Sequence, residues 1–199
     1  MVTYYSDKEL EVAAFERAKP GKSCSGDAHK VIQTEGYTIC AIVDGLGSGE
    51  SAFQSSKAAI DVIEAYQELS LNQIVEACNE ALVNKRGAVL TVIKIDYHNR
   101  KISYCNHGNI GFVLYLSDGT TVQPVPARGY LSGRKQPIKT SSFPYLSDSA
   151  FVLYSDGLKK RPDKNLFLQM KSPKNEIKSL FSEEHYAIDD VTILVGKLF

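Results

Sequence analysis

The sequence predicts an α+β domain in which helices cover antiparallel sheets, and three of its features support this fold class. Short runs rich in β-branched and apolar residues alternate with polar turns along much of the chain. Two stretches with helical spacing of apolar residues follow one another directly. The 199 residues are 43% hydrophobic, enough for one sizeable core. We therefore expect a single domain over residues 1–199, without a linker.

The first half of the chain is expected to contain strands followed by a helix pair. Residues 9–18 alternate enough for an edge strand, although they also contain good helix formers. Residues 29–34 and 37–43 form a predicted strand pair, rich in β-branched residues. Apolar residues at helical spacing then predict two consecutive helices joined around Ser70.

The second half is expected to be mostly strands. Four β-type runs separated by polar turns predict a meander: AVLTVIKID, KISYCNHGN, GFVLYLS and TTVQPVP. A glycine-rich basic loop, RGYLSGRKQP, separates them from a β-type stretch near SFPYL and the strand AFVLY. A helix near NEIKSLFSE and a last strand, VTILV, complete the chain. The sheets are therefore expected to be largely antiparallel.

Composition argues against several classes of function. Lysine plus arginine (23) equals aspartate plus glutamate (23), so there is no basic excess for binding a nucleic-acid backbone. The N-terminus is charged and lacks an apolar signal segment, and no run is long enough for a membrane helix. We therefore expect no nucleic acid and no membrane among the partners.

The four cysteines indicate a reducing compartment. Cys24, Cys40, Cys78 and Cys105 are widely spaced and form no CxxC pair. Three of them lie in apolar or helical patterns that suggest core packing. This usage predicts a cytoplasmic protein.

The stretch AIVDGLGSGESA, residues 41–52, leads an apolar strand directly into Asp44 and three glycines. GSGESA matches the letters of a G-x-G-x-x-A dinucleotide loop and lies between a predicted strand and helix. A nucleotide-binding unit, however, needs a second parallel strand that ends in an acid about 20 residues later. A second helix follows here instead, which disfavours the nucleotide loop and leaves Asp44 unexplained.

An ordinary turn is the second interpretation, and the chain offers a comparison. Asp118 and Gly119 lie between two strand-like runs, as expected for a type I′ hairpin turn, and need no further role. Asp44 and Asp156 differ because each follows an almost wholly apolar strand, and what comes next is not a facing strand.

A metal site is the third interpretation. Asp27, in a glycine-containing loop, and Asp189, ahead of the last strand, join Asp44 and Asp156 as carboxylates at strand ends. Carboxylates gathered at one sheet edge repel one another unless cations lie between them, and Mg²⁺ and Mn²⁺ prefer oxygen ligands. The spacing alone also permits each aspartate simply to cap a turn or helix.

Six stretches in order resemble the motifs of the metal-dependent serine/threonine protein phosphatases of the PPM type: SGDAHKV, VDGLGSG, KRGAVLTVIKI, HGNIGF, LYSDGL and DDVTILV. The resemblance covers nearly the whole chain, and GKSxxGD, NKRGA and GYLSG resemble the small phosphatases of sigma-B stress signalling within that family. It implies a four-layer αββα sandwich of two antiparallel sheets flanked by helices, the PPM phosphatase fold. It also implies two divalent cations, Mn²⁺ or Mg²⁺, and hydrolysis of phosphoserine or phosphothreonine by a water between them.

The resemblance assigns roles by motif position. Asp44 would contact both metals and the water that bridges them, and the carbonyl of Gly45 would add an oxygen ligand. Asp27 would hold one metal directly or through water. Asp156 and Asp189 would hold the other.

Some positions depart from the family pattern. Gly26 replaces an acid, and Lys22 stands where a phosphate-binding arginine is common, so a phosphate contact would lack the bidentate fork. Leu46 replaces a histidine that could act as general acid. Asn109 and Lys160 stand where carboxylates of a third metal site would be expected.

Phosphorylated STAS-domain proteins of a stressosome are the substrates that the resemblance implies, for a monomeric enzyme acting as a negative regulator of sigma-B. Two alternatives stay open: a phosphatase of another anti-sigma-factor antagonist, or a non-catalytic pseudophosphatase that binds phosphoproteins. The loop at 128–137 is either a substrate-docking surface or a solvated connector. His29 and His107 are either catalytic or packing residues.

Overall fold

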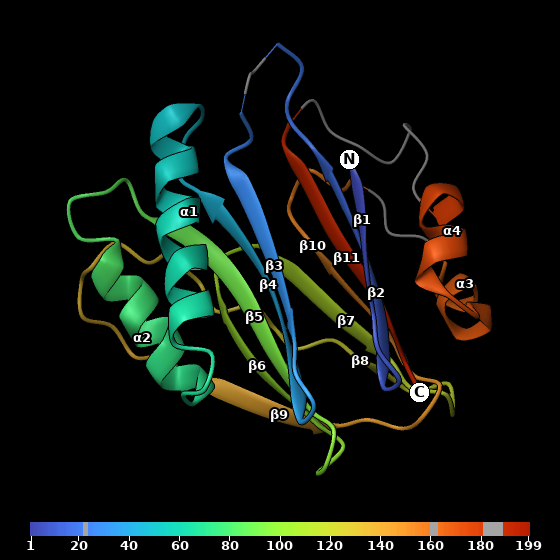
Figure 1. The fold of residues 1–199 in the computed structure, drawn as a ribbon. Coiled ribbons are helices and arrows are strands. Elements are labelled where there is room, and N and C mark those ends of the chain that lie inside the picture. Colours follow the sequence, from blue (N-terminus) through green and yellow to red (C-terminus); the bar gives the residue numbers. More distant parts are fainter. Residues whose placement is uncertain (22–23, 160–162, 181–188) are drawn as a thin grey trace.

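The computed structural model describes residues 1–21, 24–159, 163–180 and 189–199, which form two antiparallel sheets packed face to face with helices outside (Figure 1). The six-stranded sheet contains, in spatial order, β1 (Val2–Ser6), β2 (Leu10–Arg17), β11 (Val191–Leu198), β10 (Ala150–Tyr154), β7 (Gly111–Tyr115) and β8 (Thr121–Val122). The five-stranded sheet contains β3 (Asp27–Gln33), β4 (Tyr37–Gly45), β5 (Ala88–Asp96), β6 (Lys101–His107) and β9 (Thr140–Pro144). The helices are α1 (Glu50–Ala65), α2 (Leu71–Ala81), α3 (Lys164–Gln169) and α4 (Pro173–Leu180). The αββα sandwich expected from the sequence is confirmed.

The central strands are apolar throughout because both of their faces are covered. In β4, Cys40 and Ile42 pack between the two sheets, whereas Ile39, Ala41 and Val43 pack against α1 and α2. The six-stranded sheet is covered in the same way, by the other sheet on one face and by α3 and α4 on the other. A continuous apolar run, rather than strict alternation, is therefore typical of these strands.

The predicted helix pair is confirmed. Ile63 of α1 and Ile74 and Cys78 of α2 are fully buried against the five-stranded sheet. Ser70 begins the second helix, and its backbone N–H donates to the side chain of Gln73 at 3.1 Å. The two helices pack against each other, and α1 also packs against β3 and β4.

The structure corrects two strand predictions. Residues 10–17 are not an edge strand, because β2 lies between β11 and β1, which the sequence did not reveal. The four predicted runs from 88 to 126 do not form one meander: β5 and β6 belong to one sheet, and β7 and β8 to the other. The chain changes sheets near Gly108, at a φ of +107, where an added Cβ would lie 2.3 Å from the side chain of Val89.

The turn at Asp118 also differs from its prediction. Gly119 has a φ of +89, whereas Asp118 does not have a positive φ, so the turn is not type I′. The N–H of Gly119 donates to the carbonyl of Leu116, and the N–H of Leu116 donates to the carbonyl of Thr120, both at 2.9 Å. This is a three-residue loop with the glycine as its bulge.

The helix predicted near the C-terminus corresponds to α4 as far as Leu180, whereas residues 181–183 lie outside the described residues. The short helix α3 was not predicted.

Three cysteines are buried, and all four are free thiols. Among the described residues, no helix combines the length and the apolar composition needed to cross a bilayer.

Candidate metal centre

Two carboxylates face each other across the first strand pair. Asp27 is the first residue of β3, not a loop residue as expected, and Asp44 is the next-to-last residue of β4. The two are direct partners in the antiparallel register. Like charges placed directly opposite one another destabilise a sheet, so this pair indicates a function that outweighs its cost.

The other carboxylates come from the neighbouring sheet. Asp156 follows β10, and Asp189 and Asp190 precede β11, its antiparallel neighbour. The N–H of Ser155 donates to the carbonyl of Thr192 at 3.0 Å, which continues the pairing to the ends of both strands. The three acids therefore meet at the same end of the sandwich as the first two.

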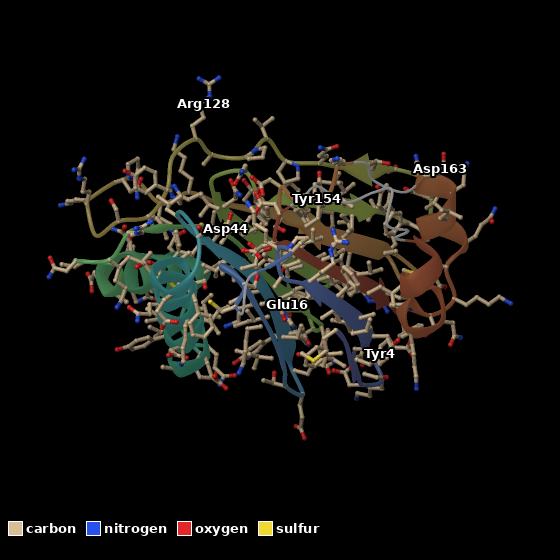
Figure 2. All side chains as sticks on the ribbon, turned by 90° about the horizontal axis from the view of Figure 1, so that it is seen from above. Tyr4, Glu16, Asp44, Arg128, Tyr154 and Asp163 are labelled. Atoms are coloured by element: carbon tan, nitrogen blue, oxygen red, sulfur yellow. The ribbon has the colours of Figure 1, made fainter. Side chains whose placement is uncertain are left out.

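A cavity of about 200 Å³ lies where the two sheets bring these strand ends together. Its lining comprises Asp27, Asp44, Gly45, Leu46, Gly47, Asp156, Asp189 and Asp190. Figure 2 looks down on this end of the molecule, with Asp44 near the centre of the view. All five residues expected to hold metal are thus at one cavity, whereas Lys22 lies outside the described residues.

Burial and mutual repulsion disfavour the charged forms of the two central acids. Burial raises the pKa of Asp44 from 3.8 to about 8, with further contributions from Asp27 and Asp156. Burial also raises the pKa of Asp27 to about 7, against the lowering effect of the neighbouring Ser155 hydroxyl. Both acids would regain their usual charge if cations stood between them.

The donor set fits hard divalent cations. Oδ2 of Asp27 is buried and has no hydrogen-bond partner among the described residues. Carboxylate and carbonyl oxygens are the ligands that Mg²⁺ and Mn²⁺ prefer. No group of three acidic, histidine or cysteine side chains within the described ranges already has the spacing of a closed ligand set. Mg²⁺ usually keeps several of its waters, so it does not need an all-protein cage.

Asp190, which follows Asp189 in the family motif, has a supporting role that its place in the sequence does not reveal. Its two carboxylate oxygens accept from the backbone N–H groups of Lys19 and Gly26, each at 2.7 Å. An added Cβ on Gly157 would lie 2.1 Å from the Asp190 carbonyl oxygen, so Gly157 permits this close approach. Asp190 thus ties the segment before β3 to the ends of β10 and β11, and the doubled acid ahead of the last strand was its only signal.

The glycine that follows Asp44 at the end of β4, Gly45, is required by the close approach of α1. An added Cβ there would lie 2.0 Å from the carbonyl oxygen of Ala52 in the first turn of α1. The helix can therefore begin directly against the strand end that carries Asp44.

Leu46 lines the cavity and Asn109 binds one of its carboxylates, and neither side chain supplies a proton or a charge. Leu46 is half-buried and packs against the core between the sheets. The side-chain amide of Asn109 donates to Oδ2 of Asp156 at 2.8 Å, a contact that replaces the carboxylate a third cation would need. Lys160 lies outside the described residues.

Neither candidate histidine lines the carboxylate cavity. His29 Nδ1 lies 3.5 Å from Glu16 Oε2, between β2 and β3. His107 is buried, burial lowers its pKa, and it lines a separate cavity with Arg128 and Lys139.

A groove of about 650 Å³ leads from the carboxylates to the loop at 128–137. It is lined by Asp44, Leu46, Val89, Gly108, Asn109, Asp156 and the segment 126–129. Arg128 projects away from the body of the molecule (Figure 2). Leu131 exchanges backbone hydrogen bonds with Ala88, and the Asn79 side chain binds the backbone of 132–134. The loop is therefore fixed to β5 and α2 beside the groove.

Comparison with known proteins gives a full-length relative. RsbX of Bacillus subtilis (strain 168), a phosphoserine phosphatase, is 36% identical over 199 residues, and the match covers 100% of both chains. The crystal structure of RsbX in complex with magnesium has a TM-score of 0.91, with 34% identity and full coverage of both chains.

Two further structures match over nearly all of this chain. A chain from a study of the bacterial stressosome is 27% identical, with a TM-score of 0.86, and the match covers 95% of this chain and 100% of that one. The catalytic domain of the serine/threonine phosphatase PstP, solved with two manganese ions, shares the fold at 17% identity, with a TM-score of 0.76 and coverage of 96% and 98%. The expected two divalent cations agree with these metal-bound structures.

The family model described as stage II sporulation protein E (SpoIIE) matches residues 34–198. Together with the RsbX match, this range includes most of the strands that bring the carboxylates together. The chain belongs to the SpoIIE family of PP2C-type (PPM) metal-dependent protein phosphatases.

Proposed function

We propose that this protein hydrolyses phosphoserine or phosphothreonine in STAS-domain proteins of a stressosome and thereby restores the resting state of sigma-B signalling. The observation that carries the proposal is the cavity in which Asp27 and Asp44 face each other beside Asp156 and Asp189. The full-length similarity to RsbX supports the substrate class.

Asp44 is the central acid of the proposed metal site, because it lines both the small cavity and the groove. Asp27 and the Gly45 carbonyl would hold cations from the β3–β4 side, and Asp156 and Asp189 from the other sheet. When bound, two divalent cations supply an activated water and neutralise charge on the phosphoryl oxygens. Asp190 keeps the two sides in register through its hydrogen bonds to Lys19 and Gly26.

Leu46 stands at the position of a general acid, so protonation of the leaving oxygen would fall to a metal-bound water or to another residue. Leu46 lines both cavities and has no ionisable group. We expect turnover of a substrate with a good leaving group, such as an aryl phosphate, to be less limited by this absence than turnover of phosphoserine.

Phosphate release from a phosphorylated STAS protein tests the proposal, measured with Mn²⁺, with Mg²⁺ and with a chelator. We expect release only with metal, and none from Asp44→Asn. Asp118→Asn is the matched control, because Asp118 is an exposed aspartate whose contacts are local to its hairpin. Equal turnover by Asp44→Asn and Asp118→Asn would contradict the assignment.

A pseudophosphatase is the second candidate, favoured by Gly26 and Leu46, which stand where the family pattern has polar groups. It predicts binding of the phosphoprotein without release under any metal. Release from another anti-sigma-factor antagonist, and none from the stressosome protein, would instead keep the chemistry and change the substrate.

A further inference from the structure

Arg86 lies beside the loop that follows β4, at the edge of the carboxylate cavity. β4 and β5 are antiparallel neighbours, and the N–H of Leu46 extends their pairing by donating to the Gly87 carbonyl at 3.0 Å. One residue further along each segment, the Arg86 side chain lies against Gly47, which lines the cavity.

Gly47 provides the space that the guanidinium occupies. An added Cβ on Gly47 would lie 2.5 Å from Arg86 Nη1. Gly47 also has a φ of +98, a conformation that residues with side chains rarely adopt. The arginine therefore packs against bare backbone at the mouth of the site, and a larger residue at 47 would displace it.

The guanidinium is not engaged by the acids nearby. Arg86 is exposed and makes no hydrogen bond or ion pair with another residue of the described ranges. Lys19 behaves differently, since its Nζ lies 3.6 Å from Asp189 Oδ1 and its backbone N–H binds Asp190. Arginine has five donors in a planar fork, and here they remain available to a ligand.

The segment that carries Arg86 is held from its other side as well. The ring of Tyr130 lies against Gly87, where an added Cβ would lie 3.0 Å from Tyr130 Cδ2. Leu131 pairs with Ala88 by two backbone hydrogen bonds, at 2.8 and 2.9 Å. The backbone next to Arg86 is therefore fixed on one side by the loop after β4 and on the other side by residues 130–131.

We propose that Arg86 binds the phosphoryl oxygens of the substrate at the rim of the carboxylate cavity, an inference that rests on the phosphatase function proposed above. A phosphate dianion approaching five aspartates needs positive charge on its outer side as well as on its inner side. A guanidinium supplies that charge in a bidentate geometry that suits phosphate. Gly47 then has a second purpose, which is to let this fork approach the site.

The test compares Arg86→Ala, Arg86→Lys and the neighbouring control Lys85→Ala. The measurements are kcat/KM on the phosphoprotein and on p-nitrophenyl phosphate, the inhibition constant of inorganic phosphate, and Mn²⁺ affinity by calorimetry. For Arg86→Ala we expect a loss of roughly 10- to 100-fold in kcat/KM on both substrates and about tenfold weaker inhibition by phosphate. Arg86→Lys recovers little because the fork is lost, whereas Lys85→Ala and Mn²⁺ affinity stay within about twofold of wild type.

Three outcomes would overturn the proposal. Unchanged inhibition by phosphate in Arg86→Ala would exclude a phosphoryl contact. Tighter Mn²⁺ binding would assign Arg86 to charge balance among the aspartates, and loss on the protein substrate alone would assign it to docking. Calorimetric binding of inorganic phosphate to the Mn²⁺-loaded protein tests Arg86 even if the wild type releases no phosphate. Gly47→Ala is a second route to the same result, since it displaces the guanidinium without removing it.

Discussion

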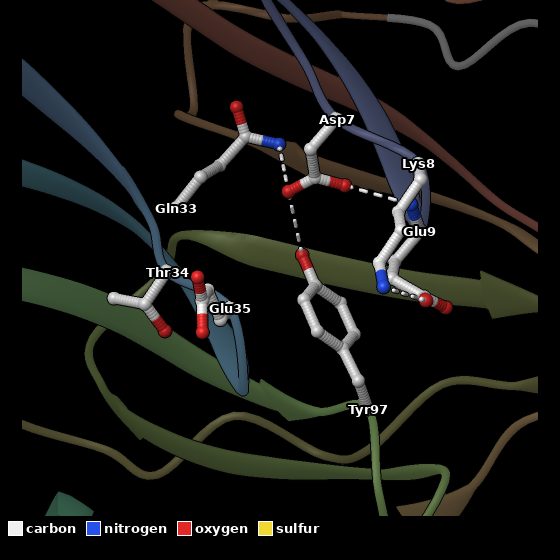
Figure 3. Close-up of a pocket in the computed structure, with 7 residues that line it drawn as sticks. All are labelled: Asp7, Lys8, Glu9, Gln33, Thr34, Glu35 and Tyr97. Atoms are coloured by element: carbon white, nitrogen blue, oxygen red, sulfur yellow. Dashed lines mark hydrogen bonds and ion pairs between the residues drawn. The ribbon is translucent and has the colours of Figure 1, made fainter.

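The two ends of the sandwich use aspartate in opposite ways. At the end away from the cavity, Asp7 accepts hydrogen bonds from the backbone N–H groups of Glu9 and Leu10, from Gln33 Nε2 and from the Tyr97 hydroxyl (Figure 3). At the other end, Oδ2 of Asp27 has no partner among the described residues, and Asp44 faces it. The carboxylate of Asp7 has protein donors for both of its oxygens and ties the two sheets together. The Asp27 carboxylate, in contrast, keeps one oxygen without a donor in the described part of the chain, and a second carboxylate faces it.

This difference in hydrogen bonding indicates that Asp7 serves the stability of the fold, whereas Asp27 and Asp44 serve its function. The cavity beside Asp7, lined in part by Glu9 and Glu35, is also acidic, but the carboxylate of Asp7 is fully occupied by protein donors. A carboxylate used in this way holds the fold and has little left to offer an ion. Unsatisfied carboxylates are expected to lower the stability of the metal-free protein and to increase its affinity for cations.

Activity gives the largest expected difference between the two ends. Asp44→Asn removes a charge from the metal site, so we expect kcat to fall more than about 100-fold, since metal-assisted charge stabilisation is worth several kcal/mol. Asp7→Ala should leave kcat per folded molecule within about twofold of wild type. Initial rates on a phosphoprotein with saturating Mn²⁺ measure both, and a comparable loss in Asp7→Ala would remove the distinction.

For the free energy of unfolding of the metal-free protein, we expect Asp7→Ala to be destabilising and Asp44→Asn to be stabilising. Asp7→Ala leaves several donors without an acceptor, and we expect it to lower the free energy of unfolding by roughly 2–3 kcal/mol. Urea unfolding with a chelator present measures this. Lys8→Ala, at an exposed neighbouring residue, is the control and should change stability by less than about 0.5 kcal/mol. A near-neutral Asp7→Ala would show that the hydrogen bonds at this end contribute little.

The same unfolding experiment should find that Asp44→Asn stabilises the metal-free protein. Asparagine keeps the shape of the side chain and removes a buried charge, so we expect a gain of about 1 kcal/mol or more at about pH 8, equivalent to roughly one pKa unit. A loss of stability would mean that the Asp44 charge is already compensated within the protein.

The pH dependence of the metal-free protein follows from the raised pKa values of Asp27 and Asp44, about 7 and about 8 instead of 3.8. The folded state holds these protons more tightly than the unfolded chain. The resulting stabilisation is complete below about pH 4, is lost progressively as the pH rises, and is gone once the pH has passed through the folded pKa values of about 7 and about 8. Between about pH 4 and pH 8 we therefore expect wild type to lose stability relative to the Asp27→Asn/Asp44→Asn double variant. Urea unfolding in chelator at each pH measures this difference. Parallel profiles would refute the raised values.

The loop beside the groove should give the smallest effect. Tyr130 is 45% exposed although its ring lies against Gly87, so its outer face is available to a protein substrate. We expect Tyr130→Ala to weaken kcat/KM on the phosphoprotein by about fivefold and to spare p-nitrophenyl phosphate. Equal losses on both substrates would exclude a docking role.

Most of the site could be predicted from the sequence because its signals are local. Asp44 and Asp156 each follow a continuous apolar strand, which made both of them candidates for a metal site, although the same pattern also permitted simple turn or helix caps. Their convergence depends on how the two sheets pack, because β4 and β10 belong to different sheets. Asp27 was assigned to a loop because a polar residue at the first position of a strand has no periodic signal. Its register opposite Asp44 depends on the length of the β3–β4 hairpin.

The remaining features depend on contacts between distant segments. β1 and α3 are short and become stable only against the six-stranded sheet, so their local patterns were weak. The switch of sheets at Gly108 follows from packing against Val89 rather than from composition. Asp190 lies in DDVTILV and Arg86 in KRGAVLTVIKI, but neither stretch reveals the distant segment that the side chain contacts.

Calorimetric titration of Mn²⁺ into the metal-free protein tests the central claim most directly. If Asp27, Asp44, Asp156 and Asp189 form a cation site, wild type binds two equivalents of Mn²⁺, Asp44→Asn loses most of that binding, and Asp7→Ala retains it. Binding that is unchanged in Asp44→Asn, or absent from wild type, would contradict the account and leave the carboxylates at this end without an explanation.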